Sequence, residues 1–488
     1  MKYPSLWLKN NRSLLLKILD FADKKKVKLY LVGGVLRDIL LEREKDNPDI
    51  DFCIKGNAIK FSKALAHELK CGFVVLDQEH GCGRIVKKGK ENIYTLDFSD
   101  YRGKTIEDDL FHRDLTINSM ALELDKIFEP GSFMDHLIDP YQGRKDLRKK
   151  TIRMVNKDSF DEDPLRILRV FSYAALFGFK IEKQTIKLAG LKKKLILNAS
   201  WERMRDEIFK TLSAGKSYEY IRQLDKQGIL VFVFPEINSM NKLRQGPYHH
   251  LDVWAHSLET LKQMEPVLKN YAKIQDPSKY INTEISSGHK RYELLKLAAL
   301  LHDVGKPATF RVDKGKVKFY GHDRVGSRIL EVVAKRLKLS SQEERFLRQV
   351  TLFHLRPGFM ANASVLTKKA KFRFFRDCAE EAVSVLLVSL ADQRATKGYL
   401  TIERCRKRHE RLVRRLIKEY FDKQKETKPE RLIDGNDLMR NFKIEPSPLI
   451  GKLLRELEEL QATGRIHTQE DALREAKKML TVSGAVVK

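Results

Sequence analysis

A chain of 488 residues, 42% of them apolar and 33% charged, has the composition of a globular protein rather than a disordered one, and its length predicts about three domains. The 94 lysine and arginine residues outnumber the 66 acidic residues and give a net charge of +28, so we expect a polyanionic partner that composition alone does not specify. The apolar runs are too short to span a bilayer, so no membrane association is expected. The five cysteines are an odd number without Cys-x-x-Cys spacing, so a reducing, cytoplasmic location is expected.

The first pattern along the chain is an apolar strand, Leu29–Val32, that leads into Gly33 and Gly34 and a helix over 35–41. A Gly-Gly turn at the start of a helix leaves backbone N–H groups open to an anion. Arg37 can add charge-assisted hydrogen bonds to phosphate oxygens. We interpret this segment as a phosphate site; a turn without a ligand is the alternative.

Two acidic residues follow on the next predicted strand. Side chains alternate along a strand, so Asp49 and Asp51 are expected on one face while Ile50 and Phe52 point to the core. Neighbouring carboxylates suit a hard cation such as Mg²⁺. A solvated strand edge is the alternative interpretation.

Residues 1–150 alternate strand and helix signals, which is typical of a mixed α/β domain. Further elements are expected as strands at Ile50–Ile54, Phe73–Leu76 and Ile93–Phe98 and a helix over Ala58–Leu69. Asp97 lies on the last of these strands, where it is a candidate third carboxylate or, equally, the cap of a turn.

Beyond Thr151 the pattern becomes almost wholly helical. We expect a helical neck over 151–225, a second helical domain over 226–428 and a helical tail over 429–488. The polar stretch 271–290 is poorly periodic and predicts a surface loop.

A strongly basic segment lies late in the second helical domain. Between Arg404 and Lys418 only Glu410 is acidic, whereas eight residues are basic. A solvated helix face is the simpler interpretation of such a run. A helix that tracks phosphates is the alternative, because the whole chain is basic.

Five blocks, in this order, resemble the class II tRNA nucleotidyltransferase and bacterial poly(A) polymerase family. They span about the first 215 residues: Gly33–Asp38 with Asp49–Asp51, Arg113–Asn118, Asp139–Arg153, Glu162–Arg169, and Trp201–Arg203 with Glu207. The resemblance implies an α+β fold with a polymerase β-like nucleotidyltransferase head, an all-α neck, an HD-type body and a tail. His112 stands where the family commonly has a second Arg, and Ser119 where it has Ala.

The resemblance implies a role for each matched residue. Catalysis and the binding of Mg²⁺ at the transferase site are assigned to Asp49 and Asp51. Nucleotide binding is assigned to Gly33, Gly34, Arg37, Arg113, Asp114, Asn118, Asp163, Arg166 and Arg169. A capped helix start at Asp114 is the alternative for the Arg113–Asn118 block.

The block Glu162–Arg169 is expected to form a helix that presents Asp163 and Arg166, three residues apart, on one face. An acid acceptor beside an Arg donor complements the Watson–Crick edge of cytosine or adenine, which offers an amine donor beside a ring acceptor. In the family this pair selects CTP and ATP without a nucleic-acid template. An i,i+3 salt bridge is the alternative.

A second constellation resembles the HD metal-dependent phosphohydrolase superfamily. His256, His302, Asp303 and Asp392 occur in its order, and an apolar helix over Leu294–Leu301 runs into His302. Imidazole and carboxylate together suit Mn²⁺, Ni²⁺, Fe²⁺ or Mg²⁺. His322 and His354 are candidates for further ligands or substrate contacts.

These patterns predict transfer of AMP from ATP to the 3′ end of tRNA or another RNA. Transfer of CMP from CTP is left open. The interval from Asp51 to Arg113 is compact, which leaves A-adding, CC-adding, CCA-adding and poly(A) activity open. One alternative is an HD phosphohydrolase acting on cyclic or other phosphoesters, with the head serving RNA binding. Another is an RNA chaperone without catalysis. The oligomeric state is not predicted.

Overall fold

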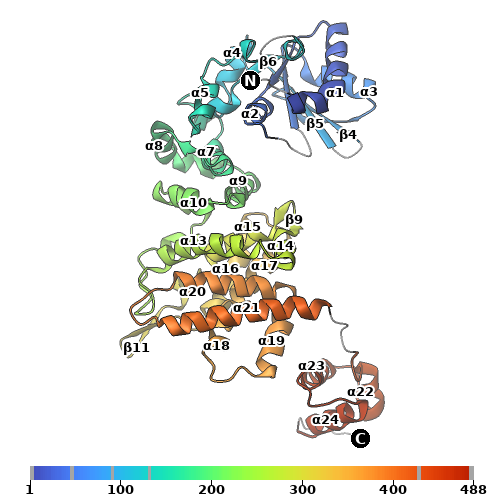
Figure 1. Cartoon of the computed structure of the whole chain (residues 1–488), viewed down its shortest axis with the longest axis vertical. Coiled ribbons are helices and arrows are strands. Elements are labelled where there is room, and N and C mark those ends of the chain that lie inside the picture. The colour runs from blue at the N-terminus through green and yellow to red at the C-terminus, as the bar shows by residue number, and fades with distance from the viewer. Residues whose placement is uncertain (1–4, 44–48, 90–92, 130–132, 426–429, 483–488) are drawn as a thin grey trace. The chain divides into compact units, whose positions relative to one another are not determined.

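The computed structural model describes residues 5–43, 49–89, 93–129, 133–425 and 430–482. By its contacts the chain divides into two compact units, Met1–Val233 and Phe234–Lys488 (Figure 1). In the described part of the chain, no helix has both the length and the apolar character needed to cross a membrane.

The first unit combines one sheet with helices. Its strands are β1 (Leu29–Val32), β2 (Asp49–Ile54), β3 (Gly72–Asp77), β4 (Cys82–Lys88), β5 (Ile93–Asp100), β6 (Ala121–Glu123), β7 (Thr151–Ile152) and β8 (Lys180–Ile181). Its α-helices are α1 (Ser5–Lys24), α2 (Gly34–Leu40), α3 (Ala58–Glu68), α4 (Ile106–Phe111), α5 (Gly143–Arg148), α6 (Ser159–Glu162), α7 (Arg166–Phe177), α8 (Lys183–Leu191), α9 (Trp201–Ser213), α10 (Ser217–Lys226) and α11 (Leu230–Val233).

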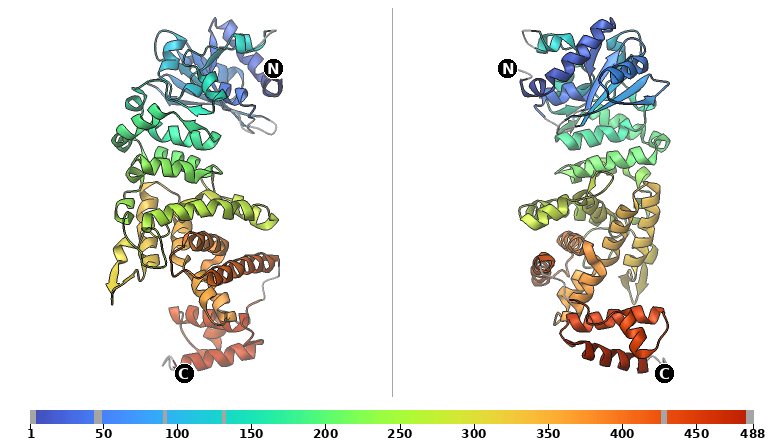
Figure 2. Two further views of the ribbon diagram at one scale, coloured as in Figure 1. Left: turned by 60° about the vertical axis from the view of Figure 1, so that its left-hand side comes forward. Right: turned by 90° about the vertical axis from the view of Figure 1, so that its right-hand side faces the viewer.

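The large sheet has the order β3-β4-β5-β2-β1-β6, and β2 and β5 are its parallel pair. One face is apolar and packs against α3, which lies beside the sheet in Figure 2, and Phe21 of α1 contacts Phe61 of α3. Phe52 of β2 stacks on Phe98 of β5 with ring centroids 4.8 Å apart, and Phe61 of α3 contacts Phe98. The core of the unit therefore lies between this face and these helices.

The expected alternation on β2 is confirmed. Ile50 and Phe52 are fully buried, whereas Asp49 is exposed and Asp51 is partly exposed. Strand β4 was not predicted from the sequence. Ile85 is its one buried aliphatic residue and the others are mostly polar, so the strand shows no alternation of apolar and polar residues.

The expected continuous helix over Glu162–Arg169 is wrong. Helix α6 ends at Glu162 and α7 begins at Arg166, and Asp163 between them has extended dihedrals (φ −146°, ψ 102°). Proline at 164 disfavours the helical conformation for the residue before it. The Asp163 carboxylate then accepts a hydrogen bond from the Leu165 N–H, which stabilises the break.

The second unit is almost all helical. Its α-helices are α12 (Ile237–Met240), α13 (Val253–Tyr271), α14 (Gln275–Asn282), α15 (Arg291–Leu301), α16 (His322–Arg336), α17 (Ser341–Phe353), α18 (Arg356–Asn362), α19 (Lys368–Cys378), α20 (Ala382–Ala395), α21 (Glu403–Lys425), α22 (Gly435–Phe442), α23 (Pro448–Ala462) and α24 (Gln469–Val482). Two small hairpins complete it: β9 (Glu284–Ser286) with β10 (His289–Lys290), and β11 (Arg311–Asp313) with β12 (Lys316–Lys318).

Helices α15 and α20 form the centre of this unit. Both are buried on nearly all sides, which is typical of a helix surrounded by others. Helix α20 packs between α13 and α21, and the three lie side by side in Figure 1. The last three helices enclose a separate small core that includes Leu438, Leu453 and Ala476.

The expected surface loop over 271–290 is wrong, because this stretch forms α14 and the β9–β10 hairpin. Helix α14 is short and buries only Pro277 and Ile281. So few apolar positions give no recognisable period in the sequence. The expected apolar helix before His302 is confirmed as α15.

Candidate functional site

The register of the sheet brings the acidic residues of the head together. Asp51 lies directly opposite Val32 on β1 and directly opposite Asp97 on β5. Paired residues on adjacent strands point to the same face, so Asp51 and Asp97 lie side by side, and Asp49 is one period away. Arg84 of β4 continues this row and holds Asp97 through two hydrogen bonds of 2.8 and 2.7 Å.

A tight turn at Gly33 borders the acidic row. Gly33 has a φ of +73°, and a Cβ atom there would lie 3.1 Å from both Asp51 Oδ2 and a terminal nitrogen of Arg113. The backbone conformation favours glycine, and the close approach leaves little room for a Cβ atom. Arg113 is held by buried Asp109, one helical turn earlier, at 2.9 Å. The turn, one carboxylate and one guanidinium thus meet at one place.

A buried polar network lies behind Arg113. Asn118 accepts a hydrogen bond from Arg37 and donates one of 3.0 Å to Asp114. The other Asp114 oxygen is 2.7 Å from Arg169 of α7. Burial raises the pKa of Asp114, but Arg169, Asn118 and the Leu115 N–H outweigh it and lower that pKa to about 2.

Arg37 is buried beside the Gly33-Gly34 turn, since a Cβ atom at Gly34 would lie 3.1 Å from one of its terminal nitrogens. It is 4% exposed, donates to Asn118 and Asp38, and its guanidinium lies over the rings of Tyr173 and Phe177. These contacts join α2 to α7. The structure therefore brings Arg37 together with Asn118, Asp114 and Arg169.

Asp163 and Arg166 make separate contacts. Arg166 is buried, and its two terminal nitrogens donate to Ser159, Glu162 and the backbone oxygen of His112. Asp163 pairs with Arg203 of α9 at 2.7 Å. The alternative of an i,i+3 salt bridge between them is therefore wrong, because each residue has a partner from another segment.

The donor set of the head fits a hard cation. Asp49 and Asp51 offer only carboxylate oxygens from one face of β2, and such oxygens are the protein ligands that Mg²⁺ prefers. Asp97 adjoins them but is paired with Arg84. No group of three close ligand atoms occurs here among the described residues, so the acidic pair is the candidate site.

In the second unit, five elements bring the predicted HD residues together. His256 comes from α13, His302 and Asp303 follow α15, and Asp392 comes from α20. His256 Nε2 lies 2.9 Å from Asp392, and His302 Nε2 lies 3.1 Å from Asp303. His322 from α16 and His354 after α17 join them, with Nε2 atoms 3.3 and 3.8 Å from Asp303.

Three of these histidines share one arrangement. His302, His322 and His354 each direct Nδ1 to a backbone oxygen three residues earlier, at 2.9, 2.8 and 2.6 Å. A carbonyl only accepts, so Nδ1 carries a proton, and in the neutral imidazole Nε2 then carries the lone pair. All three Nε2 atoms are buried and have no hydrogen-bond partner in the described structure. This tautomer is the one that ligates a metal, so the cluster fits a transition-metal ion.

A close backbone contact brings the N-terminus of α16 to this cluster. A Cβ atom at Gly305 would lie 2.2 Å from the His322 backbone oxygen and 2.5 Å from the Gly326 nitrogen. Only glycine allows this approach. Asp303 is also held by Lys306, whose ammonium nitrogen lies 2.5 Å from one carboxylate oxygen.

Sequence reasoning missed several residues of these sites. Asp109 stands four residues before Arg113, an i,i+4 spacing that predicts an ion pair on a helix, so the signal was present. Arg84 lies on the unpredicted β4, and Arg203, which the Trp201–Arg203 block named without a role, pairs across forty residues with Asp163. No local pattern indicates either contact.

Family models match most of the chain in four segments. A "Poly A polymerase head domain" matches residues 29–153, and a "Probable RNA and SrmB- binding site of polymerase A" matches residues 178–241. An "HD domain" matches residues 253–397, and a domain of tRNA nucleotidyltransferases matches residues 331–476.

Whole-length relatives agree with these segments. The A-adding tRNA nucleotidyltransferase of Deinococcus radiodurans is 30% identical over 449 residues, covering 91% of this chain and 93% of the relative. The CC-adding tRNA nucleotidyltransferase of Geobacter sulfurreducens is 28% identical over 93% of this chain and 92% of the relative.

Solved structures share the fold. A CCA-adding enzyme in complex with ATP has a TM-score of 0.65 at 22% identity, covering 99% of this chain and 98% of that one. The Thermotoga maritima CCA-adding enzyme in complex with tRNA has a TM-score of 0.62 at 23% identity, covering 96% and 95%. The head, with its acidic row beside a glycine turn, is thus that of a template-independent nucleotidyltransferase. The chain belongs to the class II tRNA nucleotidyltransferase and poly(A) polymerase family and carries an HD domain.

Proposed function

We propose that the chain adds AMP from ATP to the 3′ end of tRNA, and that CMP is at most a second substrate. The observation that carries this proposal is the meeting of Asp51, Arg113 and the Gly33 turn on one face of the head. The A-adding relative, which aligns over nine-tenths of both chains, supports the choice of AMP.

Asp49 and Asp51 would hold Mg²⁺ at this site. Bound there, Mg²⁺ supplies charge stabilisation for the attacking 3′-oxygen and for the pyrophosphate that leaves. Arg113, fixed by Asp109, offers N–H donors to the triphosphate next to the Gly33 turn. Asp114, Asn118 and Arg169 fix the wall of the nucleotide site as a rigid buried network.

Base choice is proposed to rest on Asp163 and Arg166, with Arg169 beside them. The contacts of Arg166 fix its guanidinium plane, and the partly exposed pair of Asp163 with Arg203 leaves the carboxylate at the surface of the site.

Replacing Arg166 by Lys would keep the charge but lose the planar guanidinium with its fixed N–H donors. We expect Arg166→Lys to incorporate UMP and GMP more readily relative to AMP, measured as kcat/KM ratios for single nucleotides; unchanged ratios would contradict the role.

The interval between Asp51 and Arg113 supports a single-nucleotide specificity. Its described residues are built almost entirely into α3, β3, β4, β5 and α4, with short connections. A head without a long flexible segment here has little means to reshape its nucleotide site between bases. This compactness favours A addition over complete CCA addition.

A product-length assay tests the proposal. The protein is given tRNA ending before the 3′-terminal C residues, after them, or after the final A, with one NTP at a time. We expect one AMP to be added to tRNA that ends in CC, and little extension of the other two. Extension of the shortest tRNA by CTP would instead indicate CC or CCA addition.

A second candidate function is metal-dependent phosphoester hydrolysis in the HD domain, on cyclic phosphates or phosphomonoesters. It is favoured by the three buried Nε2 lone pairs that converge on Asp303. His256, His302, Asp303 and Asp392 would hold Mn²⁺, Ni²⁺, Fe²⁺ or Mg²⁺, which would supply an activated water.

We expect His302→Ala to lose both phosphoester hydrolysis and Ni²⁺ binding measured by calorimetry. Retention of full metal binding would contradict the assignment.

We propose the cytoplasm as the location of this activity. The five cysteines are free thiols, two of them buried. A reducing compartment keeps such thiols reduced.

A further inference from the structure

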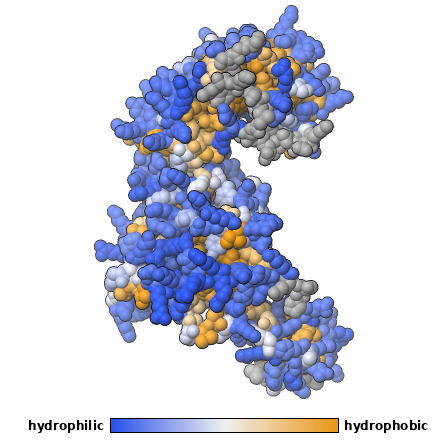
Figure 3. All heavy atoms as spheres, in the orientation of Figure 1, coloured by the Kyte–Doolittle hydropathy of each residue, from blue (hydrophilic) through white to orange (hydrophobic). Residues whose placement is uncertain are grey.

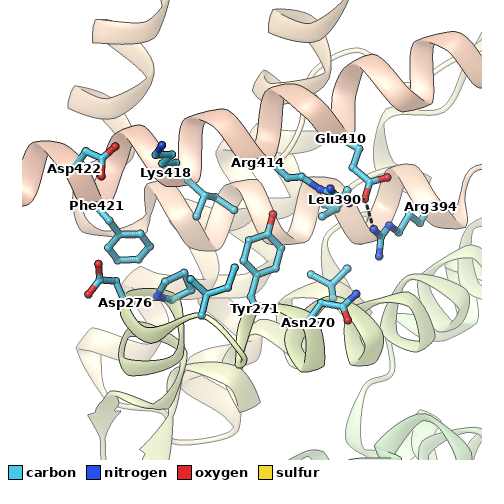
Figure 4. Close-up of a pocket in the computed structure, with 14 residues that line it drawn as sticks. Asn270, Tyr271, Asp276, Leu390, Arg394, Glu410, Arg414, Lys418, Phe421 and Asp422 are labelled. Atoms are coloured by element: carbon cyan, nitrogen blue, oxygen red, sulfur yellow. Dashed lines mark hydrogen bonds and ion pairs between the residues drawn. The ribbon is translucent and has the colours of Figure 1, made fainter.

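The second unit holds a cavity away from the HD cluster. It lies between α13, α14, α20 and α21 and has a volume of about 540 Å³ (Figure 4). That volume is within the range of about 300–1,000 Å³ found for small-ligand sites. Its walls are largely apolar, including Val267, Ile274, Leu390 and Phe421.

One polar atom in this cavity lacks a partner. Tyr271 is 8% exposed, and its hydroxyl is buried without a hydrogen-bond partner among the described residues. Figure 4 shows the ring extending from α13 towards α21, with the hydroxyl between the labelled Arg414 and Lys418. An unsatisfied buried hydroxyl costs free energy, which a ligand with a polar edge would recover.

The charges around the cavity balance. Glu410 pairs with both Arg394, at 2.5 Å, and Arg414, at 2.8 Å. At the other end, Asp276 pairs with Lys425 at 2.8 Å. Three cations and three anions line the cavity in total. The interior therefore suits a neutral group with apolar faces and a hydrogen-bonding edge, which describes a nucleobase.

The cavity opens beside a stripe of positive charge on α21. Arg404, Lys407, Arg411, Arg414 and Lys418 are all exposed and are spaced by three or four residues, so they lie on one face of the helix. The opposite face is buried against α20. Figure 3 shows hydrophilic side chains over α21 with an apolar patch beside them. Such a stripe is complementary to an RNA backbone.

Arg414 and Lys418 belong to both features, since they lie on the stripe and line the cavity. A strand that follows the stripe would thus pass the cavity mouth. Proteins commonly recognise RNA by inserting an unpaired base into a site with aromatic and Arg side chains.

We infer that this cavity binds an unpaired base of an RNA whose phosphates follow the basic face of α21, an inference that rests on the proposed tRNA substrate. Tyr271 supplies a hydrogen bond to the base edge, and Ile274 and Phe421 contact its faces. The occupant is a nucleotide within the RNA chain, because the cavity itself offers no excess charge for a free nucleotide's phosphates.

The test uses the full chain without NTP and two RNA probes: a hairpin with an unpaired loop and the same stem as a blunt duplex. Tyr271→Phe removes only the hydroxyl, and Ile274→Glu puts a charge at the mouth, where residue 274 is already exposed. We expect hairpin affinity to fall about 2- to 10-fold for Tyr271→Phe. A loss of at least about tenfold is expected for Ile274→Glu, with duplex affinity unchanged.

A double variant, Lys407→Gln with Arg411→Gln, tests the stripe at two exposed positions that do not line the cavity. It should reduce the slope of log affinity against log salt by about 1.5 for both probes. Matched controls on α16 are Val332→Glu and the pair Arg328→Gln with Lys335→Gln, all at exposed positions. These controls should behave as wild type.

Tyr271→Phe should not lower the melting temperature, because the hydroxyl it removes has no partner in the protein. Equal affinities of wild type and both cavity variants for the hairpin would overturn the inference, as would equal losses for hairpin and duplex. Transfer of AMP is measured separately at saturating tRNA, where the cavity variants should keep the wild-type kcat. Wild-type protein that binds the hairpin but transfers no AMP would refute the proposed function and leave this site standing.

Discussion

At the scale of single residues, the proposed nucleotide site is stabilised by charged groups that are buried in pairs. Asp114 with Arg169 and Arg113 with Asp109 are the clearest, at 2.7 and 2.9 Å. A buried charge without its partner is strongly destabilising, so each pair fixes the geometry of both members. The functional groups can then act without being ordered by the substrate.

The depressed pKa of Asp114 predicts how stability depends on pH. Its folded value of about 2 lies below the ordinary 3.8, so the ion pair stabilises the fold fully above pH 4 and is lost as the pH falls towards 2. The contribution at neutral pH is about 2 kcal/mol. We expect the gap in unfolding free energy between wild type and Asp114→Asn, measured with urea, to shrink by about 1 kcal/mol from pH 5 to pH 3. A gap that stays constant would contradict the pairing.

The acidic pair of β2 was predictable from sequence, whereas its surroundings were not. Alternation alone placed Asp49 and Asp51 opposite Ile50 and Phe52, because a strand has a period of two. The pairing of Asp97 with Arg84, and the burial of Arg37 under Tyr173 and Phe177, depend on tertiary contacts that have no local signal. The roles of these residues in binding stay predictions.

At the scale of elements, breaks and close approaches position the sites. Pro164 ends α6 before α7, which sends Asp163 to Arg203 and Arg166 to the backbone of His112. The sequence contained this signal, but the helical spacing of the surrounding apolar residues concealed it. In the polar stretch over 271–290 the sequence carried no signal for the helix that forms. Helix α14 buries only Pro277 and Ile281, which are too few to give a helical period of apolar residues.

The contact at Gly305 gives a second prediction. Gly305→Ala must push the start of α16 away, because a Cβ there would lie 2.2 Å from the His322 oxygen. We expect a loss of about 1–3 kcal/mol in unfolding free energy and weaker Ni²⁺ binding by calorimetry. Gly358→Ala in α18 is the matched control: open space surrounds it, so a gain of up to about 1 kcal/mol is expected. Equal effects of the two substitutions would show that the close approach is unimportant.

At the scale of the whole molecule, the residues proposed for the two chemistries belong to different compact units. The acidic row lies in Met1–Val233 and the histidine cluster in Phe234–Lys488. Sequence blocks predicted both sets, because their residues stand in a recognisable order. The packing of the helices in the second unit was harder to predict from the sequence. A helix such as α20 is apolar around most of its surface, so no single face can be assigned to the core.

This separation predicts independent losses. His302→Ala should abolish phosphoester hydrolysis and leave the kcat of AMP transfer within about twofold of wild type, because the two sets of residues lie in different compact units and effects of residues without shared partners add. Parallel assays of one protein preparation measure both rates. A transfer rate that falls together with hydrolysis would show that the two units are coupled.

The most direct measurement compares Asp51→Asn with wild type for RNA affinity and AMP transfer in the same preparation. Asparagine keeps the shape of the side chain but removes the charge that a cation requires. The prediction is an unchanged tRNA dissociation constant with transfer reduced by about 10³-fold or more, the loss of several kcal/mol of charge stabilisation. Transfer within about tenfold of wild type would contradict the assignment of catalysis to β2.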